Sequence, residues 1–251
     1  MKTRGFTLLE LMIVMVIMGI GAAVSMRFIS SMAHTQVAST ERNQALSGAR
    51  FAIERLRREL SQAYSPSVYI SDNGSCVHFV PVIAAGAYNG QVENASAIFN
   101  WPLSQQDKTI SFHMAVNPAS AGPASAWQNY PNTLPENVSP LVEDLLGLPE
   151  LAFDDVFDSN IVFNYDSAKH RYTLLKPETV SFCASEGELR RYRQQLDMPD
   201  DKGSLMLTSL KSDKLFGDYN ERYQILPLIM TLTTRDGDIV LPTQLQVNYE
   251  P

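Results

Sequence analysis

The feature that constrains this chain most is a run of apolar residues close to its N-terminus. Residues 11–26 carry no charge, and the longer stretch 6–26 carries a single one, Glu10. A helix of about 21 residues is roughly 32 Å long, which is enough to cross the ~30 Å hydrocarbon core of a bilayer. We therefore predict a single-pass transmembrane helix over residues 6–26.

The basic residues around this segment predict its orientation. Lys2 and Arg4 precede it, and the next basic residue is Arg27. Because basic flanks stay on the cytoplasmic side, the N-terminus is expected in the cytoplasm. Everything after Arg27 is then expected outside the cytoplasm.

Two ordinary interpretations compete with a specialised anchor. A secretory signal has a basic start, an apolar core and a small-residue cleavage site, which Gly21-Ala22-Ala23 or Ala23-Val24-Ser25 would supply. A plain membrane anchor explains the length equally well. Neither explains Glu10, because a carboxylate in an apolar segment is costly in a membrane and usually has a partner. The residues alone leave these three interpretations open.

The octapeptide Gly5-Phe6-Thr7-Leu8-Leu9-Glu10-Leu11-Met12 resembles the class III signal of type IV prepilins and of type II secretion pseudopilins. The resemblance implies that a prepilin peptidase removes the leader, residues 1–5, by cutting after Gly5. It also implies that Phe6 becomes a methylated N-terminus and that Glu10 is the assembly glutamate. The implied partners are other minor and major pilins and the pilus assembly platform of the inner membrane.

The resemblance gives Glu10 a physical role in a fibre. Helices that pack side by side in an apolar core would leave an unpaired carboxylate buried, at considerable cost. The N-terminal amine of the neighbouring subunit would pair with Glu10, and a misplaced subunit would leave both charges unpaired. The expected location is the inner membrane with a periplasmic head before assembly, and the pilus at the cell surface afterwards.

An amphipathic pattern predicts that the helix continues over residues 27–64. Apolar residues recur at steps of three and four on one side, namely Ala45, Ala49, Ile53, Leu56, Leu60 and Ala63. The opposite side is expected to be solvated, with ion pairs four residues apart, namely Arg50–Glu54, Glu54–Arg58 and Arg55–Glu59. Tyr64-Ser65-Pro66 is expected to end the helix, since the residue before a proline avoids the helical region.

The remaining residues, 65–251, predict one globular, β-rich head with one core. Strands are expected over residues 76–82, 97–101, 109–116, 160–165, 171–176, 179–184, 188–192, 205–210, 226–234 and 239–249. The last two flank Arg235-Asp236-Gly237-Asp238, a hairpin signal, and Pro242 predicts an edge or a bulge. Residues 117–149 are expected to form a loop insertion with a short helical turn over 140–147. The fold class is α+β, with a long N-terminal helix packed on an antiparallel sheet.

Two cysteines lie in predicted strands. Outside the cytoplasm, Cys76 and Cys183 are more often paired in a disulfide than free, and separate buried thiols are the alternative. Neither has a second cysteine or a histidine at a recognised metal-ligand spacing, so no metal is expected there. Calcium is conceivable at the acidic groups Asp154, Asp155 and Asp158 or Asp200 and Asp201, although neither group has a recognised ligand spacing.

No catalytic motif is present, so neither an enzymatic activity nor a cofactor is expected. The chain has 20 basic and 27 acidic residues, a net charge of −7. Loss of Lys2 and Arg4 with the leader would leave 18 basic residues and a net charge of −9. Because phosphate contacts need lysine and arginine, no nucleic-acid partner is expected.

Two further stretches resemble particular members of the pilin group. Residues 179–183, followed by 187–192, resemble a strand–turn–strand of J-type pseudopilins, and together with 76–82 and 86–88 they resemble MshO-type minor pilins of the mannose-sensitive haemagglutinin (MSHA) pilus. This resemblance implies a minor pilin that takes part in initiating or assembling an MSHA-type pilus. The alternatives are a J-type minor pseudopilin of a type II secretion system and a tip adhesin. Exposed aromatics in residues 117–149, such as Trp127 and Tyr130, would favour the adhesin.

Overall fold

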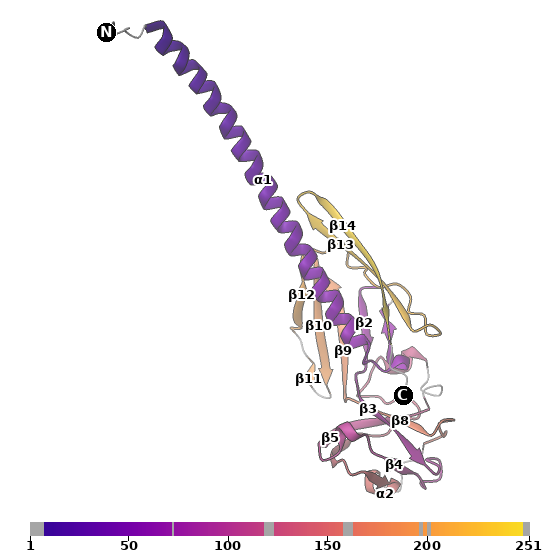
Figure 1. The fold of residues 1–251 in the computed structure, drawn as a ribbon. Coiled ribbons are helices and arrows are strands. Elements are labelled where there is room, and N and C mark those ends of the chain that lie inside the picture. Colours follow the sequence, from indigo (N-terminus) through magenta and orange to yellow (C-terminus); the bar gives the residue numbers. More distant parts are fainter. Residues whose placement is uncertain are drawn as a thin grey trace.

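The computed structural model describes residues 8–71, 73–117, 123–157, 163–195, 198–199 and 202–247. Its longest element is α1 (Leu8–Leu60), a helix of 53 residues whose N-terminal half extends far from the rest of the chain (Figure 1). Antiparallel sheets follow the helix, so the predicted α+β, pilin-like fold class is confirmed. The predicted processing residues, Gly5 and Phe6, lie outside the described residues.

The second half of α1 buries the apolar stripe that the sequence pattern predicted. Ala45 and Ile53 pack partly against the core. The members with no exposed surface are Ala49, Leu56, Leu60 and Ala63, joined by Ala52. Along this stripe Ala49 and Ala52 come before Leu56 and Leu60, so strands can approach the helix closely at the alanines, while the leucines fill the core further along the helix. Burial of each leucine contributes about 1.5–3 kcal/mol.

The helix ends four residues earlier than the predicted boundary at Tyr64. The Tyr64 amide donates to the Val80 carbonyl at 2.9 Å, and Ala63 forms an isolated β-bridge with Pro81. These contacts satisfy backbone groups in an extended conformation, so the helix does not continue to Tyr64. Pro66 instead lies in a short 3₁₀ helix, η1 (Ser65–Ser67).

A proximal sheet packs one face against α1. Its strands run in the order β1-β2-β9-β10-β11, with β12 also paired to β10, and every pairing is antiparallel. Their bounds are β1 (Tyr69–Ile70), β2 (Cys76–Phe79), β9 (Glu178–Ser185), β10 (Glu188–Gln195), β11 (Met198–Pro199) and β12 (Ser204–Leu207). The side chains that face the helix form its core partners, and they are Val77, Phe79, Val180, Phe182 and Leu189.

A long hairpin covers another flank of α1. It consists of β13 (Ile225–Thr234) and β14 (Gly237–Gln246), which pair along their full length. Its inward residues alternate with exposed ones, and the buried ones on β13 are Leu226, Leu228, Met230 and Leu232. The predicted hairpin is confirmed, as is the edge position of Pro242, because β14 pairs only with β13 among the described strands.

A second sheet forms a distal lobe, which we define as residues 82–175. Its strand order is β6-β5-β8-β3-β4-β7. The bounds are β3 (Val82–Asn89), β4 (Ile98–Asn100), β5 (Thr109–Val116), β6 (Val142–Leu146), β7 (Glu150–Ala152) and β8 (Arg171–Leu175). Short helices η2 (Leu103–Gln105), η4 (Ala124–Trp127) and α2 (Phe153–Val156) lie between them.

The distal sheet is strongly curved. Its two edge strands, β6 and β7, are separated by only three residues, Gly147, Leu148 and Pro149. This connection passes close to its neighbours, because a Cβ on Gly147 would lie 2.3 Å from both the Gln105 carbonyl oxygen and the Trp101 indole nitrogen. Only glycine fits there without a shift of backbone or ring.

The expectation of one sheet around one core is wrong. The proximal sheet, hairpin and helix share one buried cluster, and the distal lobe has its own aromatic-rich cluster. A third cluster, which includes Tyr64, Trp127, Tyr130 and Leu175, lies between them. Alternating patterns locate strands but do not say which strands pair, so the division was not visible in the sequence.

The distal lobe is inserted between two adjacent strands. β2 and β9 are hydrogen-bonded neighbours, and Phe79 pairs with Val180 at their ends. The chain leaves the proximal sheet after β2, builds the whole lobe, and returns into β9 beside the point of departure. The lobe is therefore an insertion into the simpler helix-and-sheet unit.

Two local expectations are also wrong. Residues 140–147 form no helical turn, since they contain strand β6, whose backbone is satisfied by pairing with β5. Residues 163–165 form no strand, and residues 160–162 of that prediction lie outside the described residues. The amides of Asn164 and Tyr165 donate instead to the side-chain oxygen of Asn137, at 2.9 and 3.3 Å. The short strands β1, β6, β7 and β11 were not predicted, and neither was the eight-residue strand β3, of which the predicted strand 76–82 reaches only Val82.

Candidate assembly site

The N-terminal half of α1 presents its apolar side chains outward on all sides. The 18-residue window that is long and apolar enough to cross a membrane has none of its residues buried inside the molecule. Side chains such as Leu8, Met18 and Phe28 are 78%, 72% and 62% exposed. An exposed apolar surface of this extent marks a site of contact with lipid or with other helices.

Glu10 lies in the first turn of this exposed apolar helix. The N-terminus of a helix carries a partial positive charge, which favours a carboxylate there. In the described residues before Arg27, Glu10 is the only charged side chain. The helix thus presents one carboxylate near its N-terminal end on an otherwise apolar surface.

Comparison with known proteins gives a match for this segment. Residues 1–26 match the prokaryotic N-terminal methylation motif, which is the class III signal of type IV pilins and pseudopilins. No curated protein and no solved structure matches the chain. The motif implies processing by prepilin peptidase and pilin partners in general, and proteins that carry it are structural subunits rather than enzymes.

The motif and the fold point to the same class of protein. The exposed apolar helix fits a membrane-anchored, single-pass protein, and the helix followed by antiparallel sheets is pilin-like. Both observations support a type IV pilin-like or pseudopilin-like protein.

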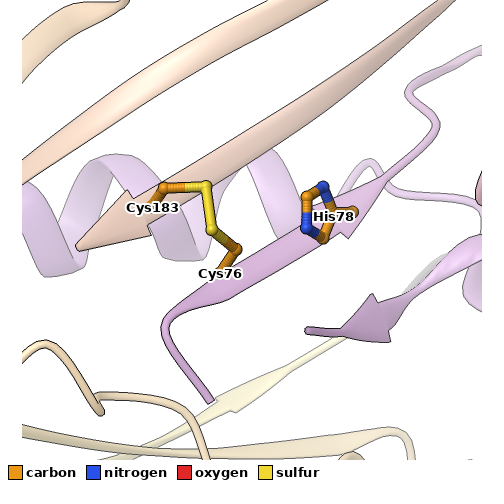
Figure 2. A group of neighbouring side chains, drawn as sticks. All are labelled: Cys76, His78 and Cys183. Carbon is orange, nitrogen blue, oxygen red and sulfur yellow. A yellow bond between two sulfur atoms is a disulfide. The ribbon is translucent and has the colours of Figure 1, made fainter. Parts of the chain in front are cut away.

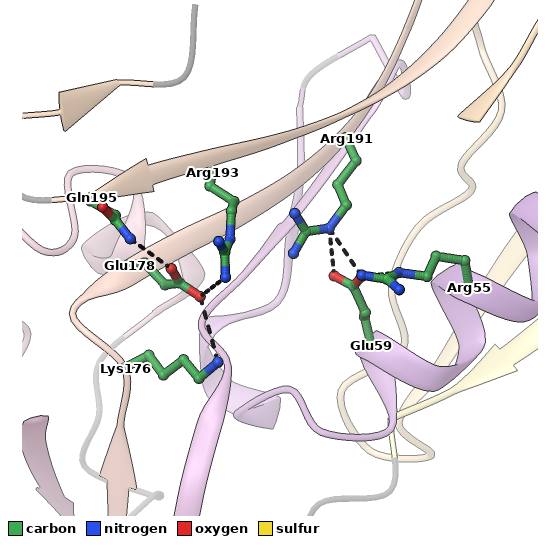
Figure 3. Close-up of polar contacts among 7 residues, drawn as sticks. All are labelled: Arg55, Glu59, Lys176, Glu178, Arg191, Arg193 and Gln195. Carbon is green, nitrogen blue, oxygen red and sulfur yellow. Dashed lines mark hydrogen bonds and ion pairs between the residues drawn. The ribbon is translucent and has the colours of Figure 1, made fainter. Parts of the chain in front are cut away.

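A mostly buried ion pair joins the helix to the proximal sheet. Glu59 accepts hydrogen bonds from the Nε of Arg191, on β10, at 2.9 and 3.0 Å, and it also pairs with Arg55 one turn earlier (Figure 3). The side chains of Glu59 and Arg191 are only 14% and 13% exposed. A mostly buried pair of this kind fixes the position of the helix against the sheet, because either charge alone would be costly.

The sequence pattern missed this contact. It placed Glu59 on the solvated side of the helix, and it predicted three ion pairs four residues apart. The Arg55–Glu59 pair is confirmed, but Glu54 pairs with Arg57 at 2.8 Å, three residues away. The basic cluster around Arg191 on β10 was the one available signal, since an arginine in a sheet that covers a helix needs a carboxylate partner.

A second buried carboxylate lies where the distal lobe joins the proximal sheet. Glu178, at the start of β9, has a side chain only 6% exposed. Arg193 and Gln195 of the neighbouring strand lie 3.4 and 3.3 Å from its oxygens, and Lys176 lies at 3.8 Å (Figure 3). These contacts compensate the buried charge and hold the return strand in register at the base of the lobe.

The two cysteines are joined on the outer face of the proximal sheet. Cys76 and Cys183 are directly opposed on β2 and β9 and form a disulfide (Figure 2). The bridge connects residues 107 positions apart, so it closes the chain around the distal lobe. Cross-linking so long a loop stabilises the fold by about 4 kcal/mol on chain-entropy grounds.

His78 lies two residues after Cys76, on the same face of β2. Its Nδ1 is 2.7 Å from the Ser181 hydroxyl, and its ring stacks on Tyr69. Burial lowers the pKa of His78 to about 4. The imidazole and both sulfur atoms lie within 4.8 Å of one another, but the disulfide leaves no thiolate to serve as a metal ligand.

The other histidines do not converge in the described part of the chain. His34 is on the exposed helix, His113 is buried and its Nδ1 lies 2.9 Å from the Ser139 carbonyl oxygen, and His170 precedes β8. Of the acidic groups considered for calcium, Asp155 instead accepts the Ala152 amide at 2.9 Å and caps α2. Asp158, Asp200 and Asp201 lie outside the described residues.

We predict that Arg191→Met destabilises the protein by about 2 kcal/mol, because Glu59 would stay mostly buried with only Arg55 as partner. The matched control is Arg57→Met, which breaks the exposed pair with Glu54 and should change stability by less than about 0.5 kcal/mol. Urea unfolding of the full chain in detergent, followed by circular dichroism, measures both. Equal effects of the two substitutions would contradict the anchoring role of Arg191.

We predict a pH dependence from His78. Its pKa is about 4 in the folded protein and ~6.5 in the unfolded chain, so below pH ~6.5 the unfolded state takes up a proton that the folded state does not. Stability is therefore lost as the pH falls from ~6.5 toward 4. His78→Gln should lose about 2 kcal/mol less than the unsubstituted protein between pH 7 and pH 4.5.

The matched control for His78 is His34→Gln, on the exposed helix, and unfolding midpoints in urea at the two pH values provide the measurement. Burial also lowers the pKa of His113, so His113 adds a pH dependence of its own. This contribution is the same in all three proteins, because His113 is unchanged in each. A pH dependence that is the same in His78→Gln and in the unsubstituted protein would refute the assignment.

Proposed function

We propose that this chain is a structural subunit of a type IV pilus, inserted in the inner membrane as a prepilin and assembled through its N-terminal helix. The observation that carries the proposal is a single carboxylate, Glu10, in the first turn of a helix whose apolar N-terminal half is not covered by the rest of the molecule. In this proposal residues 1–5 are a leader, Gly5 and Phe6 are the processing residues, and Glu10 pairs with the methylated amine of a neighbouring subunit.

The proposal divides the chain by function. Residues 6–26 cross the membrane, residues 27–64 connect the anchor to the head, and residues 65–251 form the periplasmic head, into which the distal lobe is inserted. Before assembly the head lies in the periplasm, and after assembly it lies on the cell surface. The subunit is not an enzyme and needs no cofactor or nucleic acid.

More specifically, we propose a minor pilin of the MSHA type, similar to MshO, that takes part in initiating or assembling the fibre. The support is the resemblance of the β2 and β9–β10 segments to that group, and the head of 187 residues, which is large for a bulk fibre subunit. The same strands resemble J-type pseudopilins, so a secretion system is the second candidate. Deletion of the chain should abolish surface pili in the first case and protein secretion in the second.

A tip adhesin receives no support from the aromatics that would have favoured it. Trp127 and Tyr130 have no exposed surface. They pack with Tyr64 between the two parts of the head, and Tyr130 donates to the Lys176 carbonyl. These aromatics are structural, so they are not available to contact a receptor.

We predict that Glu10→Ala leaves the protein processed and folded but reduces its incorporation into fibres by at least about tenfold, because the neighbour's amine loses its partner in an apolar surrounding. The fraction of tagged subunit in sheared fibres, relative to the membrane fraction, gives the measurement. Glu10→Asp keeps the charge and should retain part of the incorporation, whereas Glu10→Gln should not. Normal incorporation of Glu10→Ala would contradict the proposed assembly mechanism.

A further inference from the structure

Charge is unevenly distributed along the chain. The distal lobe, residues 82–175, contains three basic and ten acidic residues, a net charge of −7. Residues 27–60 of α1 contain six arginines and three glutamates, a net charge of +3. The lobe therefore accounts for a charge equal to that of the whole chain, while the helix outside the membrane is basic.

The exposed carboxylates of the lobe are concentrated in one short segment, residues 143–155, which we call the acidic strip. It comprises β6, the connection through Gly147 and β7, and it runs into α2. Its exposed carboxylates are Glu143, Asp144, Glu150, Asp154 and Asp155. Two leucines lie among them, Leu146 at 50% and Leu148 at 47% exposure. The strip thus combines negative charge with exposed apolar surface.

A groove on α1 combines positive charge with exposed apolar surface, so it is complementary to the acidic strip. It has a volume of about 690 Å³ and lies between the helix and the outer strand β14. Three arginines, Arg55, Arg57 and Arg58, and one carboxylate, Glu54, line it together with Phe51, which is 59% exposed, and Gln244 and Gln246 form its other wall. Glu54 pairs with Arg57 at 2.8 Å, and the lining keeps a net positive charge. We call this the arginine groove. Exposed Phe51 offers an apolar contact, and the arginines offer charge-assisted hydrogen bonds to carboxylates.

The groove and the strip lie far apart in one molecule. Figure 1 shows α2 at the end of the molecule most distant from the N-terminus, beyond the C-terminal end of α1. The two surfaces can therefore meet only between molecules. When the N-terminal helices of two molecules are parallel, the strip of one can reach the groove of the other only if the molecule with the groove is displaced outward along the helix axis. A fibre that grows by successive outward displacement of its subunits produces such a displacement.

We propose that the acidic strip of one subunit docks into the arginine groove of a second copy of this chain. The proposal rests on one part of the proposed function, assembly through α1, which supplies the parallel, staggered arrangement, and it requires two copies of this chain to be neighbours in the fibre. Exposed ion pairs are individually weak, but complementary charge sets the partner and the register of an interface. The pairing would thus help to select the axial displacement between heads, while the N-terminal helices contribute most of the contact area.

The first experiment places a photo-crosslinking phenylalanine analogue at Phe51 of the full-length chain in its own host. A second copy with a different tag is expressed with it. We expect light to join the two copies, and peptide mapping should locate the bond in residues 143–155. A bond to lipid, to nucleic acid, to a different protein or to another part of the second copy would overturn the proposal.

The second experiment reverses charge on each surface. Arg57→Glu with Arg58→Glu, or Glu143→Lys with Glu150→Lys and Asp154→Lys, should each lower the crosslink yield roughly tenfold. A chain that carries all five substitutions should recover the yield, because the complementarity is restored with opposite sign. If reversal on either surface alone lowers the crosslink yield but reversal on both surfaces does not restore it, the proposed pairing is wrong.

Matched controls change the same charges elsewhere. Arg42→Glu lies on α1 outside the groove, and Glu221→Lys lies outside the lobe, so neither should change the crosslink yield. Processing of the N-terminus is measured in the same samples. Unprocessed protein would refute the proposed function itself. Processed protein whose crosslink yield is unchanged by charge reversal would refute only this docking.

Discussion

Burial of one stripe of α1 is the interaction on which the rest of the structure depends. Leu56 and Leu60 reach into the core against the proximal sheet, and Ala49 and Ala52, earlier in the helix, let the strands and the hairpin approach the helix backbone. The same helix continues without a break into the apolar N-terminal half, so one continuous helix joins the head to the segment that is apolar enough to cross a membrane. The Glu59–Arg191 pair adds specificity to this packing, since it penalises any other rotation of the helix against the sheet.

The distal lobe enlarges this unit without altering it. It leaves from the end of β2 and returns at the start of β9, and the disulfide between Cys76 and Cys183 joins these two strands outside the helix-facing core. Glu178 and its cationic neighbours secure the return. A lobe held in this way can acquire its own charge and surface while the anchor, the helix and the proximal sheet keep their geometry.

The sequence predicted the long helix, the C-terminal hairpin and most of the longer strands, but it missed strand β3 and the arrangement of the head. The length of the helix, the stripe at Ala49 and Leu56, and the hairpin around Gly237 all follow from patterns between residues close in the chain. The separation into two sheets depends on pairings between distant strands, such as β5 with β8, which no local pattern records. The Glu59–Arg191 contact was missed for the same reason, because its partners are 132 residues apart.

The central claim is that α1 begins, after processing, as a pilin helix with Glu10 near a free amine. Gly5 and Phe6 lie outside the described residues, so the most direct test is the N-terminal mass of the protein purified from the membranes of its own host. The account predicts a chain that starts at a methylated Phe6. A start near Val24 or Met26 would indicate an ordinary secreted protein and would contradict assembly through this helix.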